Sequence, residues 1–165
     1  MSKGNSSMQL TRAADYAVRV MVALARAPRE QRMLLAELAH VSEAPESFLS
    51  KVLQALAKAR LIESQRGHAG GFVISATGRA ANMRQVIEAV EGQIALNVCV
   101  GGESECGRSL FCSAHPVWAR AQRAMLRELE AAKIAEMALQ KKPVFVPQDA
   151  QVLDGIAAAG DQRVG

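Results

Sequence analysis

The stretch between residues 34 and 75 constrains the fold of this chain more than any other part of its sequence. Apolar residues from Leu34 to Ala39 predict a short helix, which Val41-Ser42-Glu43 interrupts. Pro45 then suits the first turn of a second, longer helix. The apolar residues of that helix expected in the core are Phe48, Leu49, Val52, Leu53 and Leu56. A short helix, a tight break and a longer amphipathic helix are typical of a helix-turn-helix.

Two short extended runs follow this pattern directly. They cover Leu61 to Gln65 and Gly71 to Ser75, and the segment from Arg66 to Gly70 between them is rich in glycine. Such a pair predicts a β-hairpin, and a helix-turn-helix followed by a hairpin is a winged helix. The sequence therefore predicts a mostly α fold class, with a winged helix-turn-helix domain over residues 8–80 that carries a small β-hairpin wing.

Helical signals flank this pattern on both sides. Thr11 suits an N-cap, and the apolar period after it predicts a helix to about Ala27. Asn82 and Gly92 suit the start and the end of another helix, whose apolar face contains Met83, Val86, Ile87 and Val90. The sequence therefore predicts an amphipathic helix on each side of the winged-helix pattern.

The longest helical segment begins at Pro116 and is expected to run to about Gln140. Its apolar residues fall seven apart, with Leu129 on the same stripe: Trp118, Met125, Ala132 and Leu139. We assign residues 81–140 to a second unit, which contains a cysteine-rich loop and this long C-terminal helix. Residues 141–165 show no sustained period and are expected to form a loosely structured tail.

Composition narrows the class of protein further. The chain has 165 residues, three cysteines, a formal charge of +4 and a pI of about 9.3. A mildly basic chain is compatible with a polyanionic partner without requiring one. We expect a cytoplasmic protein with no membrane association, because no apolar run could span a bilayer and the first residues lack a secretory signal. Cytosolic thiols stay reduced and an odd number of cysteines cannot all pair, which argues against a disulfide framework.

The helix after Pro45 carries candidate contacts to double-stranded DNA. An α-helix fits the major groove, and the N-terminal part of the second helix of a helix-turn-helix reads the bases. Four polar residues lie off its apolar face: Ser47, Ser50, Lys51 and Gln54. At the wing tip, glycines flank Arg66 and His68, and an arginine there suits a narrow minor groove. The alternative is a helical domain whose hairpin binds protein or has no binding role.

All three cysteines lie in one Gly- and Ser-rich loop, with the spacing Cys99-x6-Cys106-x5-Cys112-x2-His115. Thiolates bind soft or borderline metals, and histidine is a common fourth donor. Zinc sites more often use closely spaced cysteine pairs, so the wide gaps favour an iron–sulfur cluster over zinc. Cysteines without a metal, or a thiol redox switch, are the alternatives.

Together these residues resemble the Rrf-type winged-helix transcription regulators, a family with iron–sulfur members of the IscR, NsrR and RirA types. The resemblance covers roughly residues 8–140 and is carried by MQLTRAADYAVRVM, ESFLSKVLQALAKARLIESQRGHAGGF, VIEAVEG and the loop that ends in CSAHPVW. It implies a homodimer paired through the long helix. It also implies that Cys99, Cys106 and Cys112 hold a [2Fe-2S] or [4Fe-4S] cluster that controls operator binding, and that Arg66 enters the minor groove.

The resemblance offers two candidates for the fourth cluster ligand. His115 matches the histidine of IscR-type members, which implies [2Fe-2S]. Asp15 matches the position at which NsrR-type members supply an aspartate from the partner subunit to a [4Fe-4S] cluster. The gap between Cys99 and Cys106 is one residue longer than in both types. We favour His115.

Other classes of function have less support in the sequence. An enzyme would need a motif that joins a nucleophile to a base, and His40 and His68 are both far from the cysteine loop in sequence. We therefore predict a cluster-sensing transcription regulator, most simply a repressor, and no enzyme. The alternatives are a family member that senses through thiols or a small ligand, and a zinc-bearing interaction module.

Overall fold

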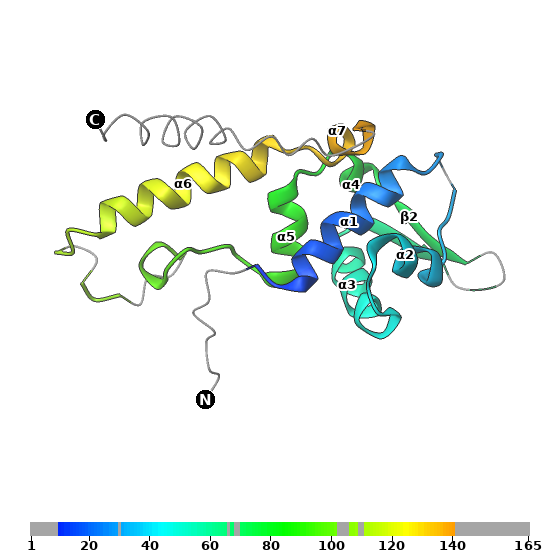
Figure 1. The fold of residues 1–165 in the computed structure, drawn as a ribbon, viewed down its shortest axis with the longest axis horizontal. Helices are drawn as coiled ribbons and strands as arrows, with labels where there is room; N and C mark the ends of the chain where they lie inside the picture. Colours follow the sequence, from blue (N-terminus) through cyan, green and yellow to red (C-terminus); the bar gives the residue numbers. More distant parts are fainter. Residues whose placement is uncertain are drawn as a thin grey trace, which may run out of the picture.

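The computed structural model describes residues 10–29, 31–65, 67, 70–101, 106–108 and 111–140. Its elements follow one another as α1 (Arg12–Arg26), α2 (Leu35–Ser42), α3 (Glu46–Lys58), β1 (Ile62–Gln65), β2 (Gly71–Ile74), α4 (Ala76–Ala80), α5 (Met83–Glu91), the short 3-10 helix η1 (Val98–Val100), α6 (His115–Ala131) and α7 (Ile134–Leu139). Figure 1 shows α6 on the far side of α5 from α2 and β2. None of the helices in the described part of the chain is long and apolar enough to cross a membrane.

Helix α1 lies at the centre of the core, where it packs against α2, α3, α5 and α7. Thr11 caps its start, because the Thr11 hydroxyl oxygen accepts a hydrogen bond from the Ala13 N–H at 3.1 Å. The buried face of α1 recurs at helical spacing and consists of Ala14, Ala17, Val18, Val20, Met21 and Leu24. The predicted first helix is confirmed, and the chain leaves it at Ala27.

Helices α2 and α3 form the predicted helix-turn-helix, but the turn comes later than predicted. The sequence predicts a break at Val41, whereas α2 continues through Ser42. Ser42 is buried and its hydroxyl donates to the Leu38 carbonyl at 2.6 Å, which keeps this residue within the helix. The turn falls on Glu43, which has a φ of 55°, and Pro45 then precedes α3.

Phe48 does not belong to the core, so this part of the prediction is wrong. Phe48 is 40% exposed, and its ring meets the Tyr16 ring edge-on with centroids 5.7 Å apart. The next residue, Leu49, is fully buried. Each residue turns a helix by about 100°, which leaves Phe48 at the edge of the buried stripe of α3.

Strands β1 and β2 form the predicted antiparallel hairpin, with Ile62 opposite Ile74. Met33, just before α2, adds a third extended chain to this sheet through two hydrogen bonds of 2.9 Å with Phe72. This close approach explains a glycine at the start of β2. Gly71 has a φ of 134°, and a Cβ there would lie 2.9 Å from the Met33 carbonyl oxygen.

A short helix that the sequence analysis did not predict, α4, follows the hairpin. Ser75 caps it: its hydroxyl oxygen accepts from the Gly78 N–H at 2.9 Å and donates to the Arg60 carbonyl at 2.7 Å. A Cβ at Gly78 would lie 1.9 Å from the Leu61 carbonyl oxygen. Glycine therefore lets α4 pack directly on the chain that enters β1.

The predicted long C-terminal helix is interrupted. Helix α6 ends at Ala131 and does not reach Gln140. The chain becomes extended, and Lys133 forms an antiparallel bridge with Asn82. The next residue, Ile134, is completely buried. Pairing and burial outweigh the local helix propensity of this segment, because propensity is a weak preference that tertiary contacts override.

The last helix, α7, packs back on α1. The Arg26 guanidinium donates to the carbonyls of Ala138 at 3.1 Å and Gln140 at 2.8 Å. Leu139, predicted to share a stripe with Trp118, lies on α7 and is 82% exposed. The seven-residue stripe therefore does not run along one helix.

Candidate DNA-binding surface and cysteine loop

The four polar residues predicted on α3 share one face of that helix. Ser47, Lys51 and Gln54 are exposed, while Ser50 is half-buried and its hydroxyl donates to the Glu46 carbonyl at 2.9 Å. Offsets of three, four and seven residues from Ser47 place them in one stripe. The structure thus brings these four side chains together on the surface, next to the turn of the helix-turn-helix.

The other predicted DNA contacts are those expected at the tip of the wing. Arg66 and His68 fall outside the described residues, so their DNA-binding roles stay predictions. The described part of the hairpin ends at the pair formed by Gln65 and Gly71. The segment that contains both residues therefore connects the last pair of this two-stranded ladder.

Arg19 joins α1 to the turn of the helix-turn-helix. Its guanidinium forms an ion pair with Asp15 at 2.9 Å, lies 3.3 Å from the Glu43 carboxylate and donates to the Ser42 carbonyl at 3.3 Å. Hydrogen bonding to Asp15 raises the pKa of the Arg19 guanidinium. Asp15, the alternative fourth cluster ligand, is therefore already paired within its own chain.

The three cysteines occupy different positions along the loop. Cys99 lies in η1 and is half-buried, Cys106 is half-buried, and Cys112 is exposed. None of them is in a disulfide. Within the described ranges, no three His, Cys, Asp or Glu side chains gather in a way that could hold a metal ion. The structure therefore does not bring the predicted ligands together.

His115 is the first residue of α6 and is linked to the last cysteine by the backbone. The His115 N–H donates to the Cys112 carbonyl at 3.1 Å, so the two residues lie on one turn. The His115 Nδ1 is buried, and no hydrogen-bond partner for it exists among the described residues. Cysteine thiolates and a histidine nitrogen that makes no hydrogen bond are the types of ligand that bind the iron of an iron–sulfur cluster. The donor chemistry fits a cluster, although the donors do not converge.

Gln122 fastens the start of the cysteine loop to α6. It is buried, its amide oxygen accepts from the Leu96 N–H at 2.8 Å, and its amide nitrogen donates to the Ile94 carbonyl at 2.7 Å. This role of Gln122 was not predicted from the sequence. The available signal was a glutamine on an otherwise apolar helical face, four residues after Trp118 and three before Met125.

Arg84 makes a second link between α6 and the elements that precede the cysteine loop. Its guanidinium pairs with Glu88 on the same helix at 3.1 Å and with Glu130 on α6. Hydrogen bonds to Glu130 and then to Glu88 raise the pKa of the Arg84 guanidinium. The Glu88 carboxylate also accepts from the Ile94 N–H at 3.4 Å. The loop that leads to Cys99 is therefore held by both helices.

Comparison with known proteins identifies the family. The Rrf2 family model, described as iron-dependent transcriptional regulator, matches residues 10–140. A Mycobacterium tuberculosis protein named as an HTH-type transcriptional regulator is 31% identical over 161 residues, which cover 96% of each chain. The HTH-type transcriptional regulator NsrR of Shouchella clausii is 27% identical over 135 residues, or 81% of this chain and 91% of that protein.

A solved structure shares the fold. CymR, described as the global cysteine regulator of B. subtilis, superposes with a TM-score of 0.63 at 24% identity and covers 79% of this chain and 95% of its own. Members of the matched family bind DNA to regulate transcription, are typically dimeric and are not enzymes. Because the family model matches most of its length, this chain belongs to the Rrf2 family of winged-helix transcriptional regulators.

Proposed function

We propose that this regulator acts as a homodimeric repressor whose operator binding is controlled by an iron–sulfur cluster. The observation that carries the proposal is the cysteine loop. All three cysteines of the chain lie within residues 99–112, none is in a disulfide, and the loop leads into α6 through His115. Cysteines concentrated in one polar loop suit metal binding better than packing, because buried cysteines otherwise behave as small apolar residues.

Cys99, Cys106 and Cys112 would supply three thiolates, and His115 would supply the fourth ligand of a [2Fe-2S] cluster. The unbonded, buried His115 Nδ1 favours this choice. Asp15 would first have to leave Arg19, and a [4Fe-4S] cluster is the alternative that goes with it. A bound cluster would supply a centre whose redox state and stability depend on its ligands and surroundings.

The loop is fastened to elements that position the DNA-binding surface. Gln122 holds it on α6 and Glu88 holds it on α5, while α5 packs on both α1 and α3. A shift of the loop would therefore change the angle between α6 and the winged helix. In a dimer paired through α6, this angle sets the distance between the two α3 helices, which must match half-sites about 34 Å apart.

Anaerobic purification tests the proposal directly. We expect a coloured protein that contains iron and acid-labile sulfide. Cys106→Ala should lose both, whereas Ser113→Ala, an exposed residue of the same loop, should keep both. Colourless native protein that contains zinc, or Cys106→Ala with a full complement of iron and sulfide, would contradict the cluster assignment.

Sensing through thiols without a cluster is the second candidate. It is favoured by the exposure of Cys112 and by the separation of the predicted ligands among the described residues. In that case oxidation of the metal-free protein by peroxide would change its operator affinity, and Cys112→Ala would remove the change. The cluster proposal predicts that peroxide changes the operator affinity of the metal-free native protein no more than it changes that of Cys112→Ala.

A further inference from the structure

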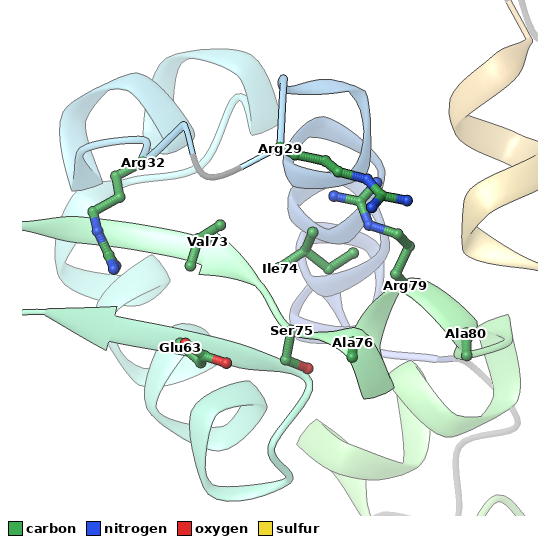
Figure 2. Close-up of a pocket in the computed structure, with 9 residues that line it drawn as sticks. All are labelled: Arg29, Arg32, Glu63, Val73, Ile74, Ser75, Ala76, Arg79 and Ala80. Atoms are coloured by element: carbon green, nitrogen blue, oxygen red, sulfur yellow. The ribbon is translucent and has the colours of Figure 1, made fainter.

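The sheet that forms the base of the wing carries a hollow that the proposed function does not use. We call it the arginine pocket; it is lined by Arg29, Arg32, Glu63, Val73, Ser75 and Arg79 together with neighbouring residues of β2 and α4 (Figure 2). Its volume is about 900 Å³. This is within the size range of small-molecule sites, which is about 300–1,000 Å³.

Two separate segments, the connection between α1 and α2 and helix α4, bring the arginines together. Arg29 follows α1, Arg32 precedes the bridge formed by Met33, and Arg79 lies on α4. In Figure 2 the guanidinium groups of Arg29 and Arg79 lie next to each other, whereas the Arg32 side chain crosses β2 at the other end of the hollow. No local sequence pattern predicts such a cluster, because Arg79 lies 50 residues after Arg29 in the sequence.

The charge of the pocket is not balanced within the described part of the chain. Three arginines and one glutamate line it, and none of the three arginines forms one of the ion pairs found there. Arg79 donates one long hydrogen bond, of 3.4 Å, to the Ala25 carbonyl. The Arg32 Nη1 is buried without a hydrogen-bond partner among these residues. Like charges held together and an unbonded buried donor are both unfavourable, and a bound anion would relieve both.

The pocket is lined by exposed Glu63 and half-buried Val73 of the sheet, and buried Ile74 at the end of β2 lines it as well. Glu63 and Val73 are paired across the hairpin and alternate with Ile62 and Ile74, which are buried. Successive side chains of a strand point to opposite faces. Helix α3 packs against β1, and no residue of α3 lines the pocket.

We propose that the arginine pocket binds a small organic anion with a phosphate or carboxylate group, as an effector site separate from the cysteine loop. Guanidinium groups match the oxygens of both groups in paired hydrogen bonds. Val73 and the nearby alanines offer apolar contact to the remainder of such a ligand. The volume of the pocket and its apolar lining residues favour a small organic anion over a phosphate of bound DNA.

An NMR titration, in which amide chemical shifts report anion binding, tests this site. Inorganic phosphate and acetate are added separately to the full chain at constant ionic strength. We expect saturable shifts of the Val73 and Ser75 amides with at least one probe, weakened at least tenfold in Arg32→Gln and in Arg79→Gln. Arg12→Gln, at the opposite end of α1 from Arg29, is the matched control and should bind like the native chain.

Two further variants distinguish a direct effect on anion binding from a loss of folded structure. Glu63→Gln removes the carboxylate and should tighten anion binding several-fold, a gain that loss of structure cannot produce. Arg29→Gln changes an exposed residue and should weaken binding. The proposal would be overturned if neither probe gave saturable shifts. It would also be overturned if the three variants of the pocket arginines bound the anion as tightly as the native chain. It would also be overturned if no free anion binds and Arg29→Gln lowers the salt dependence of operator binding by about one charge, since the pocket would then hold a DNA phosphate.

Discussion

Replacing Gln122 with leucine tests how α6 holds the segment that leads into the first cysteine. Gln122 makes two hydrogen bonds there, one to the Leu96 N–H and one to the Ile94 carbonyl. Leucine has a similar size, so the substitution leaves little empty space. Its main effect is to leave one backbone donor and one backbone acceptor without partners.

The expected loss of stability follows from the burial of these two groups. The bond to the Ile94 carbonyl is buried and the bond from the Leu96 N–H is partly buried. A buried polar group without a partner costs about 1–3 kcal/mol, and a partly buried group costs less because water can reach it. We therefore expect Gln122→Leu to lower the free energy of unfolding by about 2–3 kcal/mol.

Urea unfolding at a fixed protein concentration measures this loss, and hydrogen exchange locates it. The Leu96 amide should exchange at least tenfold faster in Gln122→Leu, since about 1.4 kcal/mol corresponds to a factor of ten. Arg120→Leu, an exposed position on the same helix, should change the free energy of unfolding by less than about 0.5 kcal/mol. A Gln122→Leu variant as stable as Arg120→Leu, with unchanged Leu96 exchange, would refute the role of this residue.

Four other substitutions test three separate parts of the structure. Gly78→Ala should lower the melting temperature sharply or prevent folding, because a Cβ would lie 1.9 Å from the Leu61 carbonyl oxygen; an unchanged melting temperature would contradict the packing of α4. Ile134→Ala should cost about 2–5 kcal/mol in urea unfolding, since it empties a completely buried site, and a cost below 1 kcal/mol would argue against the break before α7. Lys51→Ala should weaken operator binding and lower its salt dependence by about one charge, while Gln54→Ala should weaken binding without changing the salt dependence; equal salt slopes in both variants would exclude a phosphate contact by Lys51.

Local signals were sufficient for much of the fold. Thr11 and Asn82 both cap helices where the sequence predicts them, because a cap depends only on the residues of one turn. The hairpin was predicted from two short extended runs and from the glycine-rich segment between them. The polar stripe of α3 followed from helical periodicity alone.

Features that depend on distant contacts were not predictable. Helix α6 ends where Lys133 pairs with Asn82, and these two residues are 51 positions apart in the sequence. Periodicity cannot detect such a pairing. The arginine pocket likewise combines Arg29 and Arg79 from segments with no shared motif. The exposure of Phe48 was missed because an apolar residue near the edge of a helical stripe has the same spacing signal as one at its centre.

The most direct test of the central claim is the ratio of operator affinities between the cluster-containing dimer and the metal-free dimer. Both forms are prepared without oxygen and measured at one salt concentration on a duplex selected from a random pool. The proposed function predicts affinities that differ at least tenfold. Equal affinities, with iron and sulfide present in the first form only, would contradict control of this regulator by a cluster.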